Sequence, residues 1–255
     1  MFAGKTALIT GASRGIGAAV ARRIAAAGGH VAVNFARNAE AAEAVVEAIR
    51  QSGGQAFAVQ ADVGSADSIR RMFEIVDARF GREGDAPCLD FLVNNAGQGS
   101  DGTDQRLGRA TEAAFDRMVA VNARGPFFVS QEAMPRLRNG GRLVNIGSIA
   151  GRVAQPYSPA YAMTKRALQS LTMSLAQALA SRQITANLVA PGAVDTDFIA
   201  ALAQKPGWLE AAAKNTPFGR IGTPDDIAGA VMMLLSDDAG WVTGQIIEAG
   251  GGLQL

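Results

Sequence analysis

Short apolar segments alternate with longer amphipathic segments along the chain. Several short segments, such as 188–190, are apolar without alternation, which is typical of strands covered on both faces. The predicted strands are Thr6–Thr10, His30–Phe35, Gln55–Gln60, Leu89–Asn94, Arg142–Ile146, Ile184–Ala190 and Thr243–Glu248. The predicted helices are Gly15–Ala27, Ala39–Ser52, Ser65–Phe80, Thr111–Arg138, Ala160–Ser181 and Pro224–Leu235. This order predicts an α/β fold: a doubly wound, mainly parallel sheet of about seven strands with helices on both faces.

No linker or change in composition divides the chain, so residues 1–255 are predicted to form one domain. The stretch 194–216 departs from the alternation and carries Phe198, Leu202 and Trp208. It follows a strand, on the side where open α/β sheets bind ligands. We interpret it as a flexible substrate lid. The alternative is an extra pair of surface helices packed on the core.

The composition excludes several classes of protein. The 24 basic and 23 acidic residues give a net charge of +1 without a basic block, so neither nucleic acid nor a membrane is a predicted partner. The single cysteine, Cys88, excludes an intramolecular disulfide and is interpreted as a buried or loop thiol. The single histidine, His30, lies where a strand begins, so neither a zinc cluster nor a histidine-dependent hydrolase is predicted. Acid–base chemistry must come from Tyr, Lys, Asp, Glu or Ser.

The N-terminus lacks the layout of a signal peptide. The longest stretch without a charge, Ala167–Ser181, has 15 residues and is too short and too polar to span a bilayer. We therefore expect a soluble, cytoplasmic protein.

The first predicted strand ends in a glycine-rich turn, and an alanine-rich helix follows it. Glycines let backbone N–H groups approach a pyrophosphate, and a helix N-terminus favours an anion. The spacing is G-x-x-x-G-x-G, and the alternative is a purely structural turn. Its place between strand and helix favours a dinucleotide site, to which we assign Gly11, Ser13, Arg14, Gly15, Ile16 and Gly17.

The end of the second predicted strand indicates which dinucleotide binds. An NAD site usually has a carboxylate there for the ribose 2′-hydroxyl. The segment 33–38 has none, and it carries Arg37 instead. Arg37 and Arg14 could hold a 2′-phosphate, for which the planar guanidinium is well suited. Either arginine alone could be a solvated surface charge, but the two together favour NADP(H).

The ends of the third and fourth strands supply further candidates. Asp62 and Val63 are placed to contact the adenine. Asn94 and Asn95 can tie neighbouring strand ends together, and Ala96 and Gly97 leave room for a ribose. We assign Asp62, Val63, Asn94, Ala96 and Gly97 to cofactor binding. Asn95 is equally compatible with a structural role and a ligand contact.

Tyr161 and Lys165 are four residues apart on a predicted helix and so share one face. A free phenol has a pKa of about 10. An ammonium about 5 Å away, at an effective dielectric of about 20, favours the phenolate by roughly 3 kcal/mol. We therefore expect Lys165 to lower the pKa of Tyr161 by about two units. Ser148, at the end of the fifth strand, is placed to hydrogen-bond the same reacting group. A tyrosine tuned in this way exchanges protons with an oxygen, and a nicotinamide supplies the hydride.

Together these motifs resemble the short-chain dehydrogenase/reductase family over essentially the whole chain. The resemblance implies a Rossmann-type seven-stranded sheet and a catalytic tetrad of Asn122, Ser148, Tyr161 and Lys165. It implies that Asn122 perturbs its helix and holds a water that relays protons to Lys165. Tyr161 and Lys165 would also contact the cofactor, and four further residues would line its nicotinamide side: Pro191, Gly192, Val194 and Thr196. Members of the family are commonly homotetramers, so we expect a homotetramer or homodimer.

Within the family the chain is most similar to 3-oxoacyl-carrier-protein reductases and related ketoreductases. Phe128 and Gln177 stand at two places where such reductases often have basic residues that dock the carrier, although Arg124 and Arg166 are nearby. The candidate pocket residues are mainly apolar and favour a hydrophobic or aromatic ketone. These residues are Val153, Gln155, Tyr157, Phe198 and Trp208.

The leading hypothesis is NADPH-dependent reduction of a ketone to a secondary alcohol, with Tyr161 as the general acid. The substrate would be a 3-oxoacyl thioester, a polyketide or a similar small-molecule carbonyl, possibly bound to a carrier. One alternative is an NADP-dependent secondary-alcohol or sugar dehydrogenase. Another is a nucleotide-sensing regulator without catalysis, although a sensor needs no proton donor.

Overall fold

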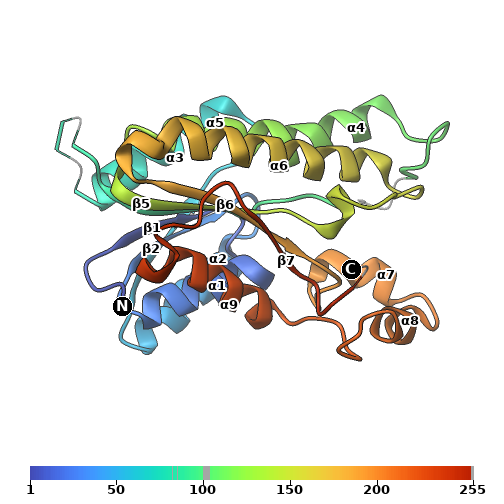
Figure 1. Cartoon of the computed structure of the whole chain (residues 1–255). Helices are drawn as coiled ribbons and strands as arrows, with labels where there is room; N and C mark the ends of the chain where they lie inside the picture. Colours follow the sequence, from blue (N-terminus) through green and yellow to red (C-terminus); the bar gives the residue numbers. More distant parts are fainter. Residues whose placement is uncertain (82, 85, 100–103, 254–255) are drawn as a thin grey trace.

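A computed structural model describes residues 1–81, 83–84, 86–99 and 104–253. Seven parallel strands form one sheet in the order β3-β2-β1-β4-β5-β6-β7 (Figure 1). The strands are β1 Thr6–Ile9, β2 His30–Phe35, β3 Gln55–Gln60, β4 Leu89–Asn94, β5 Leu137–Ile146, β6 Thr185–Pro191 and β7 Ile246–Ala249. The chain order reverses direction at β1 and β4, and open α/β sheets bind ligands at such a point. The predicted doubly wound, Rossmann-type sheet is confirmed.

Helices cover both faces of the sheet, with α1, α2 and α9 on one side and α3 to α6 on the other (Figure 1). The α-helices are α1 Gly15–Ala26, α2 Ala39–Gln51, α3 Ala66–Arg79, α4 Glu112–Val119, α5 Gly125–Ala133, α6 Pro159–Leu179, α7 Ala200–Ala203, α8 Trp208–Lys214 and α9 Pro224–Leu235. A π-helix, η1 Ala120–Arg124, lies between α4 and α5. Short 3-10 helices are η2 Ile149–Gly151, η3 Ala180–Arg182, η4 Asp197–Ile199 and η5 Asp237–Ala239. None of the described helices combines the length and the apolar character needed to cross a membrane.

The strands contribute side chains to hydrophobic clusters on both faces of the sheet. In β1, Ile9 packs into the cluster under α1, α2 and α9, and Leu8 packs into the cluster under α3, α5 and α6. Both side chains are completely buried. Side chains of a strand point alternately to opposite faces, so a fully apolar strand supplies both layers. This packing explains why the short runs lack a polar face.

The helix predicted over 111–138 is confirmed as far as Ala133, with a π-helical interruption, and is wrong only in its last five residues. The helical path changes to a π-helix at Ala120 and ends at Ala133, and β5 begins at Leu137. Leu137 pairs with Leu89 of β4 and is completely buried. Next to it, Arg138 donates a 2.5 Å hydrogen bond to the buried carboxylate of Asp90. These tertiary contacts outweigh the local helical pattern.

Several other boundaries differ from the sequence prediction by one to three residues. The sixth strand begins at Thr185 instead of Ile184, and the last strand begins at Ile246 instead of Thr243. Gly244 has a φ of +71°, which a regular strand does not permit, so the chain turns before β7 begins. The thiol of Cys88 is buried, as one of its two interpretations predicted.

The predicted lid, 194–216, contains η4, α7 and α8 in the structure. None of the residues in these three helices is buried. Val194 and Thr216, at the two ends of the stretch, are each 5% exposed. The segment is therefore anchored at its ends and exposed between them, and its movement stays a prediction.

Candidate active site

The glycine-rich turn lies against the carboxyl end of β4. A Cβ on Gly11 would stand 2.8 Å from the Cα of Ala96, and the φ of Gly11 is +62°. A Cβ on Gly17 would stand 2.5 Å from Nδ2 of Asn95 and 2.7 Å from the carbonyl oxygen of Gly11. No side chain fits at either position without moving the backbone. The turn is consequently a cradle whose floor consists of main-chain atoms.

The first turn of α1 opens from this cradle. Arg14 occupies the N-cap position, but no side chain caps the helix and no acidic residue lies in its first turn. Uncapped N–H groups and the positive end of the helix dipole favour a phosphate at this place. Ser13 lies in the turn, and Ile16 packs partly against the core. The turn therefore fits the pyrophosphate of a dinucleotide.

The side chains of Thr10 and Asn95 hold the cradle together. Thr10 Oγ1 accepts 3.0 Å hydrogen bonds from the backbone N–H groups of Asn95 and Ala96. Nδ2 of Asn95 donates 2.9 Å bonds to the carbonyl oxygens of Thr10 and Gly11. Both hydrogens of that amide nitrogen are directed at the turn, which favours the structural role of Asn95 over the ligand contact.

Asn34 of β2 is a cradle residue that the sequence analysis did not identify. Its Oδ1 accepts a 3.1 Å bond from Gly11 N, and its Nδ2 donates 3.2 Å bonds to the carbonyl oxygens of Val59 and Ala61. The signal was an amide in an otherwise apolar strand. A polar side chain that is 1% exposed must find partners, and here it joins three strand ends.

The remaining residues predicted to bind the cofactor differ in how deeply they are buried. Asn94 is buried, and its Nδ2 donates to Ser130 at 3.0 Å and to Asn145 at 2.9 Å, so its side chain lies beneath α5. Only its backbone is left to face a cofactor. Asp62 uses Oδ1 to accept a 2.8 Å bond from Gly64 N, and the Val63 side chain is buried. Arg37 is exposed just beyond β2.

Ser148, Tyr161 and Lys165 come together where β5 ends and α6 begins. Ser148 follows β5, and its hydroxyl oxygen accepts a 3.1 Å bond from Ala150 N. Its side chain also hydrogen-bonds the phenol of Tyr161. Lys165 Nζ donates a 2.9 Å bond to the carbonyl oxygen of Ile146 and lies 5.7 Å from the centre of the Tyr161 ring. The predicted common face of the helix is therefore present.

The predicted lowering of the Tyr161 pKa by Lys165 is wrong for this structure. Burial raises the pKa of the phenol to about 12, and the hydrogen bond with Ser148 opposes that rise without overcoming it. Burial lowers the pKa of Lys165 to about 8. The prediction counted only the attraction between the two groups, at an effective dielectric of about 20. It left out the cost of removing each group from water, which disfavours the charged form of both.

Asn122 lies in the π-helix η1, in agreement with the helix perturbation that the family resemblance implied. Its Oδ1 accepts a 2.7 Å bond from Gln98 N, and its Nδ2 donates a 2.8 Å bond to the Gln98 carbonyl oxygen. A Cβ on Gly97 would lie 3.6 Å from Oδ1 of Asn122 and 3.7 Å from Nζ of Lys165. Gly97 therefore separates the amide from the ammonium, and its small size leaves the space between them open.

The segment that begins at the end of β6 forms a second wall of the site, next to the glycine-rich turn. Gly192 packs on Gly250, since a Cβ at Gly192 would stand 3.0 Å from the Cα of Gly250. Pro191 ends β6, and Val194 forms a bridge with Gly222. The Thr196 side chain approaches the position of a Gly15 Cβ to 3.3 Å. All four residues expected on the nicotinamide side thus lie along one stretch, and Thr196 meets the glycine-rich turn.

The aromatic ring of Phe198 lies beside the candidate catalytic residues. Its centre is 5.7 Å from that of the Tyr161 ring, and a Cβ on Gly99 would be 2.9 Å from the ring. Tyr157, another pocket candidate, is 75% exposed. Of the predicted apolar pocket residues, Phe198 is the one for which the described structure gives a contact with Tyr161.

This arrangement of turn, tetrad and sheet has counterparts among known proteins. A family model described as enoyl-(acyl carrier protein) reductase matches residues 11–254. The chain belongs to the short-chain dehydrogenase/reductase family. Membership makes it an oxidoreductase and agrees with the motifs and the seven-stranded sheet.

Relatives within the short-chain dehydrogenase/reductase family include several reductases. The chain is 41% identical to a 3-oxoacyl-[acyl-carrier-protein] reductase of Staphylococcus aureus, with 98% of each chain covered. It is 40% identical to the tetrahydroxynaphthalene reductase of Pyricularia oryzae, covering 98% of this chain and 89% of that protein. Among solved structures, an angucycline C-6 ketoreductase with bound NADP is 42% identical with a TM-score of 0.90, covering 98% of this chain and 96% of the other.

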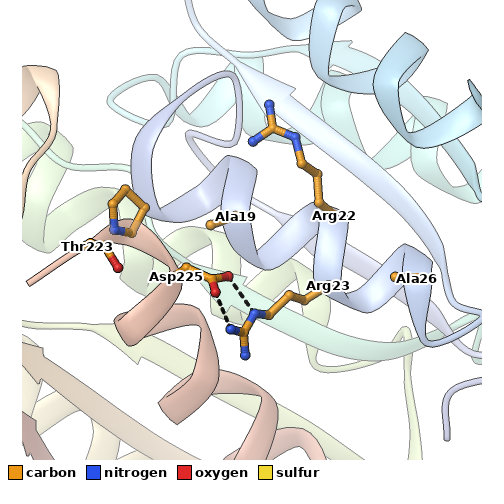
Figure 2. A pocket seen from close by; sticks show the side chains of 7 residues that line it. Ala19, Arg22, Arg23, Ala26, Thr223 and Asp225 are labelled. Atoms are coloured by element: carbon orange, nitrogen blue, oxygen red, sulfur yellow. Dashed lines mark hydrogen bonds and ion pairs between the residues drawn. The ribbon is translucent and has the colours of Figure 1, made fainter. Parts of the chain in front are cut away.

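A surface groove of about 400 Å³ lies away from this site, between α1 and the start of α9 (Figure 2). The ion pair of Arg23 with Asp225 bridges it, and Arg22 points away from that pair in Figure 2. The groove shares no residue with the site of this short-chain dehydrogenase/reductase. Among the residues that the structure describes, no cluster of three His, Cys, Asp or Glu side chains could hold a metal ion.

Proposed function

We propose that the chain is an NADPH-dependent ketoreductase that converts an apolar ketone to a secondary alcohol. The carrying observation is the phenol of Tyr161, hydrogen-bonded by Ser148 and lying beside Lys165. The phenol of Tyr161 lies beside the Phe198 ring. The two lie at the carboxyl ends of the strands, where open α/β sheets bind dinucleotides. The named ketone reductases among the relatives and the NADP-bound neighbour support the same reaction and cofactor.

The cradle residues would hold the dinucleotide. The uncapped start of α1 takes the pyrophosphate, and Arg14 and Arg37 take the 2′-phosphate. The absence of a carboxylate in the segment 33–38 removes the group that would select the 2′-hydroxyl of NAD. When bound, NADPH supplies a hydride to the carbonyl carbon. The wall from Pro191 to Thr196 lies next to the turn and would bound the nicotinamide.

The residues of the chain supply the proton. With a pKa of about 12, Tyr161 is protonated at neutral pH and can donate its proton to the carbonyl oxygen. Ser148 positions the phenol and can donate a hydrogen bond to the same carbonyl oxygen. Once the proton has left, the phenolate is stabilised by its Ser148 bond and by the nearby ammonium of Lys165. The carbonyl has then gained one hydride and one proton, and solvent would return a proton to Tyr161 by way of Lys165 and a water held at Asn122.

The substrate of this proposal is a free ketone with an apolar or aromatic face. Phe198 offers it an aromatic surface beside the proton donor. The two arginines that could replace the carrier-docking residues are engaged within the chain. Arg124 donates to the Gly64 carbonyl oxygen at 2.8 Å and lies over the Phe128 ring, and Arg166 donates to Gln169 at 2.8 Å. These contacts favour a free substrate over a carrier-bound one.

The proposal is tested by the Tyr161→Phe variant. We expect the kcat for ketone reduction to fall by about 10²–10⁴-fold, since the substitution removes the general acid. NADPH binding, measured by fluorescence titration, should persist. Tyr157→Phe is the matched control because it removes the hydroxyl of the exposed second tyrosine. Substantial turnover by Tyr161→Phe would refute the acid assignment. Failure of the wild type to oxidise NADPH with any ketone would refute the proposed reaction.

A further feature of the proposal rests on the family to which the chain belongs. We propose a homotetramer or homodimer because the family commonly forms these assemblies. Size-exclusion chromatography with light scattering distinguishes a dimer from a tetramer, and a monomer would contradict this expectation.

A further inference from the structure

The short helix η4, Asp197–Ile199, connects the two sides of the candidate active site. At its first residue, Oδ2 of Asp197 accepts a 3.1 Å hydrogen bond from a terminal nitrogen of Arg14 in the glycine-rich turn. At its second residue, the Phe198 ring lies 5.7 Å from the Tyr161 ring. Adjacent residues of one helical turn therefore contact the cofactor cradle and the proton donor.

The Arg14–Asp197 ion pair is open to solvent. The Arg14 side chain is 67% exposed and the Asp197 side chain is 66% exposed. An exposed ion pair contributes little to stability, so a stronger anion can displace the carboxylate. Arg14 is also one of the two arginines to which we assign the 2′-phosphate of NADPH. The carboxylate of Asp197 is therefore paired with the same guanidinium that would bind the 2′-phosphate of the cofactor.

Few other contacts hold η4 in place. None of its residues is buried, and neither are those of α7 and α8, which follow it. The Phe198 ring is itself 49% exposed. Thr196, just before η4, packs near Gly15 of the same turn. Because the helix has so little burial of its own, even the weak ion pair with Arg14 contributes to fixing its position, together with the contacts of the Phe198 ring.

We propose that Asp197 is a positioning residue whose ion pair with Arg14 holds η4, and with it the Phe198 ring, until the cofactor 2′-phosphate replaces the carboxylate. The inference rests on the proposed use of NADPH. A phosphate monoester carries a charge of about −1.5 to −2 and offers three acceptor oxygens, whereas a carboxylate carries −1 and offers two. The phosphate is therefore the stronger partner for Arg14. Binding of NADPH would release η4 and let the wall beside Tyr161 adjust to a ketone.

The experiment compares two nucleotides that differ only in the relevant group. 2′,5′-ADP carries the additional phosphate, 5′-AMP lacks it, and neither contains the nicotinamide. Hydrogen–deuterium exchange of the full-length protein is followed in peptides covering 194–203 at saturating concentrations of each nucleotide. In the wild type, 2′,5′-ADP should increase exchange in this stretch relative to 5′-AMP. The nicotinamide cannot contribute to this difference.

The variant Asp197→Asn removes the competing charge. Exchange over 194–203 should be raised already in the ligand-free variant, and 2′,5′-ADP should add nothing further. Its affinity for 2′,5′-ADP, measured by calorimetry, should rise about threefold, in keeping with the modest strength of an exposed pair, while its affinity for 5′-AMP stays the same. Asp195→Asn is the matched control, because Asp195 is an exposed carboxylate on the same stretch. This control should reproduce the wild type in both measurements.

Three outcomes would overturn the proposal. The first is that 2′,5′-ADP binds the wild type more tightly than 5′-AMP yet does not increase exchange over 194–203. The second is that Asp195→Asn raises the affinity for 2′,5′-ADP as much as Asp197→Asn does, which would indicate a general effect of charge. The third is equal affinity of the wild type for both nucleotides, which would also remove the preference for NADPH. In that last case, turnover with NADH and a ketone decides separately whether the proposed ketone reduction stands.

Discussion

The glycine-rich turn after β1 and the stretch 194–216 meet where Thr196 approaches Gly15, but they are built differently. In the turn, the side chains of Thr10, Asn34 and Asn95 each bond backbone groups of neighbouring strand ends. In the stretch, η4, α7 and α8 contain no buried residue. One wall of the site is thus fixed by internal hydrogen bonds, and the other is anchored mainly at its ends.

The difference follows from what each wall must recognise. The same cofactor binds in every turnover, and a cradle formed in advance avoids an ordering cost of the protein when it binds. Apolar substrates vary in shape, and segments that adjust to them come from the less stable parts of a fold. A site that holds one cofactor and accommodates substrates of different shapes therefore benefits from one rigid and one adaptable wall. The following predictions test this contrast.

The largest expected effect is on stability, where a substitution at Gly17 is compared with one at Gly207. Gly17→Val should lower the free energy of unfolding by about 3 kcal/mol or more, because its Cβ would meet backbone atoms of Gly11 and Ala12 at 2.7 and 2.8 Å. Gly207→Ala, beside α8, meets nothing within 4 Å, and its φ of +73° costs about 1–2 kcal/mol. Urea unfolding followed by circular dichroism measures both. Equal losses would contradict the contrast between the walls.

Next in size is the effect of Lys165→Met. Burial lowers the pKa of Lys165 from 10.5 to about 8, so the folded protein holds this proton less tightly than the unfolded chain does. The free energy of unfolding should therefore rise with pH between about 8 and 10.5, and the full penalty applies below pH 8. Replacing the ammonium should stabilise the protein at pH 7 by about 1–3 kcal/mol while abolishing turnover.

The measurement is urea unfolding of wild type and Lys165→Met at pH 7 and pH 10.5. The stabilisation should shrink toward the higher pH, because the wild-type lysine then loses its proton in both states. Arg166→Met, one position along α6, is the control for removing a cation from the same helix and should show no such pH dependence. A variant less stable than wild type at pH 7 would show that the bond from Lys165 to Ile146 outweighs the burial of charge.

The predictions at Gly17 and at Lys165 test features that the sequence alone reveals to different extents. The glycine spacing and the Tyr161–Lys165 interval are local patterns, and the structure places them on the turn and on one helix face as expected. The pKa of Tyr161 is not local, because it depends on how much water the fold removes. The start of β5 at Leu137 was likewise hidden, since its partner Leu89 is distant in sequence.

The polar side chains that hold the strand ends together can be read from the sequence, but the groups to which they hydrogen-bond cannot. The sequence left the role of Asn95 open, and it gave Asn94 a cofactor role that its bonds to Ser130 and Asn145 leave to the backbone alone. Asn34 is not among the predicted site residues, although a buried amide in an apolar strand needs hydrogen-bond partners. The Arg14–Asp197 pair joins residues 183 positions apart, and no periodicity reports such a contact. Long-range pairing therefore accounts for most of what the sequence could not predict.

A smaller effect is expected at the exposed edge of the rigid wall. Arg37→Ala should reduce the preference for NADPH over NADH by about tenfold, because one charge-assisted contact to the 2′-phosphate contributes about 1.5 kcal/mol. The ratio of kcat/KM for the two cofactors measures this preference. Arg22→Ala, an arginine on α1 outside the cradle, should leave the ratio unchanged (Figure 2). An unchanged ratio in Arg37→Ala would mean that Arg37 is only a solvated surface charge.

The smallest effect on stability is expected from Phe198→Ala in the adaptable wall. The ring is half exposed and η4 contributes nothing to the core, so the free energy of unfolding should change by less than about 0.5 kcal/mol. The KM for an aromatic ketone should nevertheless rise about fivefold, because an aromatic contact contributes about 1 kcal/mol. Phe218→Ala, a more exposed ring outside the lid stretch, should change neither quantity. A large loss of stability in Phe198→Ala would mean that this wall is part of the folded core, and the division into a rigid and an adaptable side would then fail.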